Sequence, residues 1–282
     1  MPVHLSPLTQ YRLVDRLRAA GCVFAEDEAR LLAGAAATPD RLSVMIGRRC
    51  AGDPLEHVLG YAEFCGRRIA VGTGVFVPRR RTALLAGVAT KAVRRSRSAV
   101  HGRVVPRPVM VELCCGSAAV SAVVLSRIGG DRIEAYAADV DPVAAGYARR
   151  NVAVPVFVGD LYQPLPAGLR RRIDVLVANV PYVPTKLIEL LPAEARRHEP
   201  RHCLDGGPDG LDLLRRVVRD ATSWLAPGGR LLVEVSAHQT TRAATAARGG
   251  GLTVEVVTDA RLDATVMVGR PRHPPHRLRA GR

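Results

Sequence analysis

A short apolar run near the middle of the chain ends in residues that could position a planar nitrogen atom. Residues 173 to 178 are rich in β-branched side chains, which is typical of a buried strand. The run stops at Asn179, because Pro181 and Pro184 exclude a continuing strand or an immediate helix. We therefore expect a polar amide at the carboxyl end of a buried strand, where ligands of open α/β sheets bind.

The four residues from Asn179 suggest a specific chemistry. An amide or exocyclic amine nitrogen shares its lone pair with a π-system and is a poor nucleophile. The Asn179 side-chain oxygen and the Val180 carbonyl could accept the two hydrogens of such a nitrogen and aim its lone pair at a methyl donor. Pro181 would stiffen the turn and Tyr182 would press on the flat face of the target, so catalysis would rest on orientation and electrostatics. A strand-ending turn whose Asn bonds its own backbone remains an alternative.

A second group of candidate residues follows the apolar run 109 to 113. Here a turn of small residues enters a helical pattern, which suits close approach of a ligand to the backbone. The turn lacks the Gly-x-Gly-x-x-Gly pattern that cradles the phosphates of a nicotinamide cofactor. Its candidate cofactor-binding residues are Glu112, Cys114, Cys115, Gly116, Ser117 and Ala118.

Two acidic residues at later strand ends complete a predicted adenosine site. Asp139 follows Gly116 by 23 positions, near the spacing of about 20 expected for a carboxylate that binds ribose hydroxyls. Asp160 could accept a hydrogen bond from an adenine amino group, with Leu161 against the ring. Taken singly, these acids could instead be solvated loop residues or caps. Their joint order and spacing, with Asn179 next along the chain, favour the adenosine site.

The elements that must position these residues alternate between strands and helices. Such alternation predicts an α/β fold, a doubly wound and mostly parallel sheet. We expect a helical domain over 1–53, a hairpin linker over 54–81, a catalytic domain over 82–270 and a disordered basic tail over 271–282. Expected strands cover 109–113, 133–138, 154–158, 173–178, 230–235, 252–257 and 264–268; expected helices cover 8–20, 25–36, 39–50, 82–95, 118–128, 142 onward, 210–225 and 239–248.

Hydrophobic content, cysteine spacing and net charge limit the classes of protein to which this chain can belong. The chain has 282 residues, 48% of them hydrophobic, and no run approaches the ~18 apolar residues of a membrane span. Six cysteines without paired spacing indicate reduced thiols in a cytoplasmic protein, and the histidines show no metal-ligand spacing. The net charge of +15 would suit a nucleic-acid partner. Nearly all of that charge is arginine, however, which favours a compositional bias over a selected binding face.

Several segments together resemble one family. The Asn-Val-Pro-Tyr segment is similar to the Asn/Asp-x-Pro-aromatic motif of S-adenosylmethionine-dependent methyltransferases that modify planar nitrogens. Pro54-Leu-Glu-His-Val-Leu-Gly, Phe64-Cys-Gly, Val77-Pro-Arg, Gly159-Asp-Leu and the run from Glu199 to Leu211 further resemble the protein-(glutamine-N5) methyltransferases of peptide-chain release factors. The resemblance implies a class I S-adenosylmethionine methyltransferase-like fold with a small N-terminal helical domain. It also implies S-adenosyl-L-methionine as cofactor and a release factor, or a related protein near the ribosome, as substrate.

The chain departs from that family's pattern at several positions. Cys114 and Ala118 stand where the family's cofactor turn has glycine, and Glu112 stands where it has Asp. A side chain at position 114 would require a backbone that avoids positive φ. Val180 replaces a proline, and Arg81 and Ala83 replace acidic residues.

These departures leave three hypotheses open. The leading hypothesis is a protein-glutamine methyltransferase. The alternatives are a nucleic-acid base N-methyltransferase and a non-catalytic protein that keeps the fold; we expect no membrane partner.

Overall fold

The first described helices form a small bundle with its own apolar core. The computed structural model describes residues 6–98 and 107–272. The N-terminal helices are α1 (Pro7–Ala19), α2 (Ala25–Ala35) and α3 (Pro39–Cys50). Ser6 and Thr38 cap the first and third by accepting hydrogen bonds from the backbone of Thr9 and Arg41. Leu17 and Leu32 are fully buried between them, so the predicted helices in this part of the chain are confirmed.

A hairpin connects this bundle to the rest of the chain. Its strands are β1 (Tyr61–Phe64) and β2 (Arg67–Ala70), which pair antiparallel. A short helix that the sequence analysis did not predict, α4 (Leu55–Leu59), precedes them and ends at Gly60 with φ 84°. Helix α5 (Ala83–Ser98) follows the hairpin and runs beyond the expected end at residue 95.

A seven-stranded sheet has the order β5-β4-β3-β6-β7-β9-β8. Neighbours from β5 through β7 are parallel, whereas β9 pairs antiparallel with β7 and β8. The predicted mostly parallel, doubly wound sheet is confirmed. The strands are β3 (Val109–Leu113), β4 (Glu134–Asp139), β5 (Val156–Val158), β6 (Ile173–Ala178), β7 (Leu225–Glu234), β8 (Leu252–Asp259) and β9 (Ala264–Pro271).

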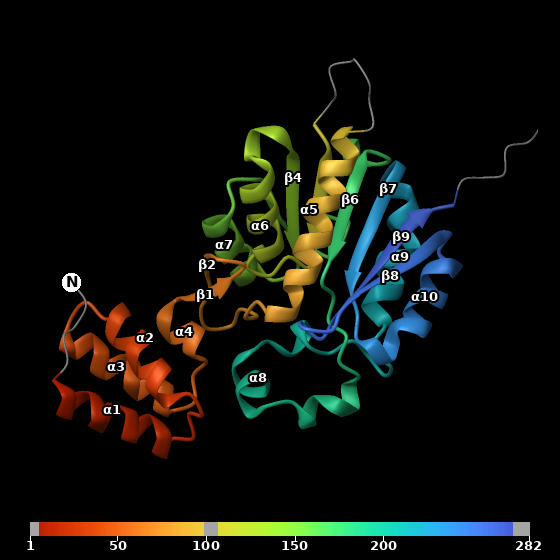
Figure 1. The fold of residues 1–282 in the computed structure, drawn as a ribbon. Coiled ribbons are helices and arrows are strands. Elements are labelled where there is room, and N and C mark those ends of the chain that lie inside the picture. Colours follow the sequence, from red (N-terminus) through yellow and green to blue (C-terminus); the bar gives the residue numbers. More distant parts are fainter. Residues whose placement is uncertain (1–5, 99–106, 273–282) are drawn as a thin grey trace, which may run out of the picture.

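Helices cover both faces of the sheet (Figure 1). Helices α5, α6 (Ala119–Ile128) and α7 (Pro142–Asn151) share one core with Met110 and Val175, while α9 (Asp212–Trp224) and α10 (Thr240–Gly249) share the other with Val111 and Leu176. Successive strand residues thus point to opposite faces, as strand geometry requires. Between β6 and α9 the chain forms a segment with α8 (Ala193–His198), which lies below the carboxyl ends of the strands (Figure 1).

The largest differences from the predicted strand boundaries are in β7 and β9. We expected the strand after α9 to begin at Arg230, but β7 begins at Leu225, and the Pro-Gly-Gly segment lies within it beside an irregular register. A Cβ on Gly229 would lie 2.5 Å from the carbonyl oxygen of Ile173, so only glycine permits this approach. Strand β9 reaches Pro271, inside the range expected to be disordered; the rest of that expectation, residues 273–282, lies outside the described residues.

The helices of the described segments are too short or too polar to cross a membrane. All six cysteines are free thiols.

Candidate active site

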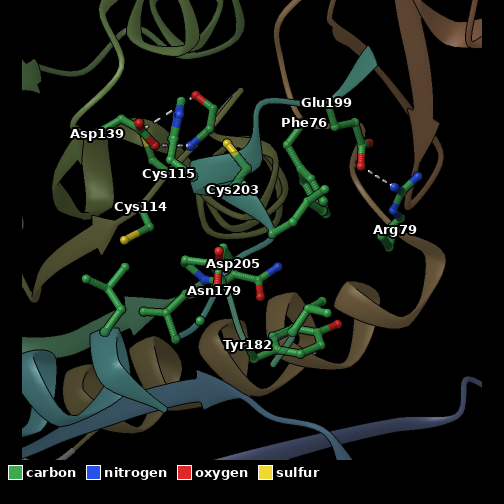
Figure 2. A pocket seen from close by; sticks show the side chains of 18 of the residues that line it. Phe76, Arg79, Cys114, Cys115, Asp139, Asn179, Tyr182, Glu199, Cys203 and Asp205 are labelled. Atoms are coloured by element: carbon green, nitrogen blue, oxygen red, sulfur yellow. Dashed lines mark hydrogen bonds and ion pairs between the residues drawn. The ribbon is translucent and has the colours of Figure 1, made fainter. Parts of the chain in front are cut away.

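A cavity of about 1400 Å³ opens at the carboxyl ends of the parallel strands. It brings together the residues that the sequence predicts at strand ends: the turn after β3, Asp139, Asp160 and the Asn179–Tyr182 segment. The segment around α8 and residues 76–82 form its other walls, and Figure 2 shows side chains from these parts of the chain facing one another.

The turn after β3 has the backbone of a glycine-rich loop, although it contains one glycine. Cys114, Gly116 and Ala118 have φ of 51°, 53° and 56°. The expectation that a side chain at position 114 requires negative φ was therefore wrong. Left-handed backbone costs a non-glycine residue roughly 1–2 kcal/mol, a cost that the surrounding structure must offset. The turn thus keeps its shape with Cβ atoms at positions 114 and 118.

We expect the free energy of unfolding of Cys114→Gly to be about 0.5–1 kcal/mol higher than that of Cys114→Ala. The substitution removes the left-handed strain, and the greater freedom of glycine in the unfolded chain offsets part of that gain. Urea denaturation measures the difference. Cys114→Ala is the control, because it keeps the Cβ atom and loses the same sulfur, which packs against the core, so the difference between the two variants isolates the backbone strain. Equal stability of the glycine and alanine variants would contradict the strain argument.

Asp139 shapes the turn and faces the cavity. Its Oδ2 accepts a hydrogen bond from the Gly116 N–H at 2.7 Å, and its Oδ1 accepts one from the Asp141 N–H at 2.9 Å. The residue is 8% exposed, and burial raises the pKa of its carboxyl above the ordinary value. Each carboxylate oxygen retains a second lone pair, so Asp139 could accept the two hydroxyl hydrogens of a ribose.

Asp160 has a partner that the sequence analysis did not foresee. Arg216, on α9, forms an ion pair with its Oδ2. Oδ1 is therefore the oxygen that could accept a hydrogen bond from an adenine amino group. Leu161 is buried beside it with φ 50°, in position to contact a flat ring. An adenosine ligand would therefore contact, at this end of the cavity, a carboxylate whose charge is balanced by Arg216.

Glu112 faces the helix rather than open solvent. Its Oε2 accepts hydrogen bonds from the backbone N–H of Ser121, at 2.7 Å, and from the Ser121 hydroxyl. The carboxyl is 4% exposed, and burial raises its pKa from 4.5 to about 7. The described contacts of Glu112 therefore hold the start of α6 against the turn.

This pKa shift makes stability depend on pH. Between pH 4.5 and about 7, Glu112 is protonated in the folded state and ionised in the unfolded chain. The folded state then binds more protons, so the stability contributed by the neutral carboxyl is complete below pH 4.5 and is lost as pH rises to about 7. The shift corresponds to at most about 3 kcal/mol. Chemical denaturation from pH 4 to 8 should show a smaller fall for Glu112→Gln than for wild type; parallel curves would contradict the assignment.

The Asn179–Tyr182 turn is held from both sides. Asn179 Nδ2 donates to the Thr82 hydroxyl oxygen at 3.5 Å, while Val180 and Pro181 are buried. On the other side, Gln239 Nε2 donates to the Tyr182 carbonyl oxygen at 2.9 Å. These contacts fix the backbone of the turn and leave the Asn179 side-chain oxygen as an acceptor for a ligand.

Glu234, at the carboxyl end of β7, is a buried residue that contacts Tyr182 and Arg81 in the cavity wall and that the sequence analysis missed. Its Oε1 accepts a hydrogen bond from the Tyr182 hydroxyl at 3.4 Å and lies 3.5 Å from Arg81 Nε. The Arg81 guanidinium lies 5.6 Å from the centre of the Tyr182 ring. Burial, followed by the Glu234 charge, raises the pKa of Tyr182 to about 12, so its hydroxyl stays protonated at neutral pH. The rule that identified Asp139 and Asn179, a polar residue directly after a predicted strand, does not identify Glu234, because the strand expected there runs to Val235.

The segment 199–211 packs directly on this turn. Glu199 accepts hydrogen bonds from the Val77 N–H at 3.1 Å and from Arg79 at 2.6 Å, so it joins two walls of the cavity (Figure 2). A Cβ on Gly206 would lie 2.7 Å from the Pro181 carbonyl oxygen, and one on Gly210 would lie 2.3 Å from that of Tyr182. The glycines of this run are therefore required by its close approach to the turn.

Solved structures with the same fold are known. The catalytic domain of hMettl16, in complex with a 3′UTR hairpin, has a TM-score of 0.52 at 13% identity, covering 84% of this chain and 83% of that one. A Thermus thermophilus 16S rRNA N2 methyltransferase, in complex with AdoMet and guanosine, has a TM-score of 0.51 at 15% identity, covering 75% and 50%. The sheet topology and these likenesses define the fold as that of the class I S-adenosylmethionine methyltransferases.

Sequence relatives define the family. The chain is 33% identical over 200 residues to a release factor glutamine methyltransferase of Geobacter sulfurreducens, covering 69% of this chain, and 37% identical over 193 residues to one of Streptomyces coelicolor, covering 67%. It spans 65% of the length of both relatives. The chain is also 36% identical over 240 residues to the release factor glutamine methyltransferase of Moorella thermoacetica, which covers 82% of this chain and 75% of the relative. No family model matches. The chain belongs to the release factor glutamine methyltransferase family.

Proposed function

We propose that this protein is an S-adenosylmethionine-dependent methyltransferase that modifies the side-chain amide nitrogen of a glutamine in a peptide-chain release factor. One observation carries the proposal: the Asn179–Tyr182 turn opens on the same cavity as Asp139 and the turn after β3. A group that presents a planar nitrogen and a ligand that presents a methyl group can therefore meet at one edge of the sheet. The names of the sequence relatives agree with this substrate.

The residues of the cavity fit the cofactor. Asp139 would hold the ribose hydroxyls, the backbone of residues 114–118 would lie against the amino-acid part, and Asp160 with Leu161 would hold the adenine. Bound S-adenosylmethionine supplies a methyl group on a positively charged sulfur. The Asp139 carboxylate suits a cationic ligand, because a nearby negative charge lowers the free energy of a positive charge in a site with little water.

The substrate amide would be oriented by the turn after β6. The Asn179 side-chain oxygen and the Val180 carbonyl accept its two hydrogens, which directs the nitrogen lone pair toward the methyl donor. Tyr182, held by Glu234, packs on the plane of the amide. Holding two groups in reactive geometry converts a bimolecular step into a unimolecular one, which accounts for most of the expected acceleration.

We also propose that different segments of the chain have different roles. Residues 1–53 would recognise the substrate protein, 54–81 would link them to the catalytic domain 82–270, and 271–282 would form a basic tail. The separate apolar core of α1 to α3 supports a helical unit at the start of the chain; Val58 of α4 belongs to the same core, so this unit extends past residue 53. A release-factor substrate and free thiols agree with a cytoplasmic location.

The test is mass spectrometry of a bacterial release factor after incubation with the protein and S-adenosylmethionine. We expect one added methyl group on the glutamine of the Gly-Gly-Gln loop, and none on a substrate in which asparagine replaces that glutamine. Methylation of ribosomal RNA and not of the release factor would favour the nucleic-acid alternative. Absence of cofactor binding in calorimetry would favour a non-catalytic protein with this fold.

A further inference from the structure

A second cavity lies on the other side of the molecule from the active site. It has a volume of about 190 Å³ and is formed by α5, β7, β8 and β9, on the face of the sheet that α5 covers. In Figure 1 these elements meet above the level of α8, which marks the active-site end. The floor is apolar, with Leu232 and Val268 among its residues. No feature of the proposed methyl transfer uses this place.

The charged side chains around the cavity are predominantly cationic. Four of them carry positive charge, whereas Glu255 is the single acidic residue of its lining. Glu255 lies 3.7 Å from Arg270, and both side chains are largely exposed, so this pair offsets little of the charge. The next acidic group, Asp174, already accepts a hydrogen bond from the Val109 N–H at 2.8 Å. The four cationic residues are Lys91, Arg95, Arg230 and Arg270.

Arg230 is the central residue of this cluster. Its Nε is buried and has no hydrogen-bond partner within the described part of the chain. Burial lowers the pKa of the guanidinium, and repulsion from Arg270 and Arg95 lowers it further. A buried donor without an acceptor, surrounded by like charges, is unfavourable in isolation. A bound anion with several oxygens would supply the acceptor and offset the repulsion.

We propose that this cavity binds a phosphate group. The guanidinium of Arg presents parallel N–H donors that match two oxygens of a phosphate, and Lys91 adds a mobile ammonium at the rim. The apolar floor excludes water from one side of the anion, which strengthens its attraction to the cations. The phosphate could belong to an RNA backbone or to a small phosphorylated molecule, because the same oxygens would be recognised in each.

The experiment compares two probes on one set of variants. Pyrophosphate and a short single-stranded RNA are titrated into the full chain at several salt concentrations. The double variant Lys91→Gln/Arg95→Gln removes two exposed charges at the rim of the cavity, so the protein should still fold. Its affinity for S-adenosylmethionine, measured in parallel, is expected to equal that of the wild type. This expectation holds whichever substrate the enzyme has. Arg41→Gln, which removes an exposed charge from α3, is the matched control.

The double variant should weaken pyrophosphate binding by about tenfold or more, as expected when two cations near a partly buried phosphate are removed. If the phosphate comes from RNA, the RNA should bind more tightly than pyrophosphate. The slope of log K against log salt should then decrease by about 1.4 in the double variant, since each phosphate contact on a single strand contributes about 0.7. Weakening of pyrophosphate alone would assign the site to a small phosphorylated molecule. If both probes bind the double variant as tightly as they bind Arg41→Gln, the proposed site is wrong.

Discussion

Replacing Asn179 by alanine is expected to lower kcat for glutamine methylation by about 100- to 1000-fold, the loss seen when one preorganised polar group is removed from a reacting centre. The substitution removes the oxygen that would accept an amide hydrogen, while Val180 and Pro181 remain buried and keep the turn in place. A free amide can then rotate in the cavity, and its lone pair is no longer aimed at the methyl group. Single-turnover kinetics with saturating cofactor measures the effect on the methyl-transfer step.

Asn179→Asp is the informative control for this prediction. The carboxylate keeps an acceptor oxygen in the same position and loses only the N–H that Asn179 donates to Thr82. We expect the Asp variant to retain clearly more activity than the Ala variant. Equal loss in both, or an Ala variant within a factor of about three of wild type, would show that Asn179 does not orient the amide in the way that electrostatic preorganisation requires.

Asp139→Ala is expected to weaken S-adenosylmethionine binding by at least about 100-fold. Two hydrogen bonds from ribose hydroxyls to a carboxylate contribute roughly 1.5–3 kcal/mol each, and each 1.4 kcal/mol is a factor of ten in affinity. The same substitution leaves the N–H groups of Gly116 and Asp141 without their acceptor, which disturbs the turn against which the cofactor would lie. Calorimetric titration of the purified protein gives the dissociation constant directly.

Asp131→Ala serves as the matched control, because Asp131 is exposed in the turn between α6 and β4. It should bind the cofactor with the wild-type constant and unfold at the wild-type temperature. A thermal unfolding curve of Asp139→Ala separates lost affinity from lost structure. Undiminished binding by a folded Asp139→Ala protein would mean that the ribose lies elsewhere in the cavity.

The sequence predicts a strand or helix accurately where the residues that determine it lie close together in the chain. Strand β6 was predicted residue for residue, because a β-branched run is stopped by an amide and two prolines within a few positions. The start of β7 was missed, because Leu225 pairs with Ile173, on a strand that lies some fifty positions earlier, and the glycines lie in an irregularity of that pairing. Local composition there indicates a loop, and only the neighbouring backbone of Ile173 makes it a strand.

Prediction of the site residues from sequence was limited in the same way, to residues fixed by local patterns. Acids and amides that end predicted strands were placed together by the topology, since parallel strands bring their carboxyl ends to one edge. Arg216 was not foreseen, because its pairing with Asp160 joins residues 56 positions apart on α9 and after β5. Glu234 contacts Tyr182 only because β7 lies next to β6 in the sheet. Strand order and helix rotation, which set such partners, are not encoded in local spacing.

The hydrogen bond from the Val77 N–H to Glu199 affects the order in which parts of the protein fold. It joins positions 122 apart, so it cannot form until the intervening chain has been synthesised and most of it has folded. Contacts of such long range close large loops and are expected late in folding. Strands β3 to β6 can pair before the cavity has its outer wall, so a partly folded chain would hold these paired strands without enclosing a ligand. Capacity for the reaction would then be acquired in one of the last steps of maturation.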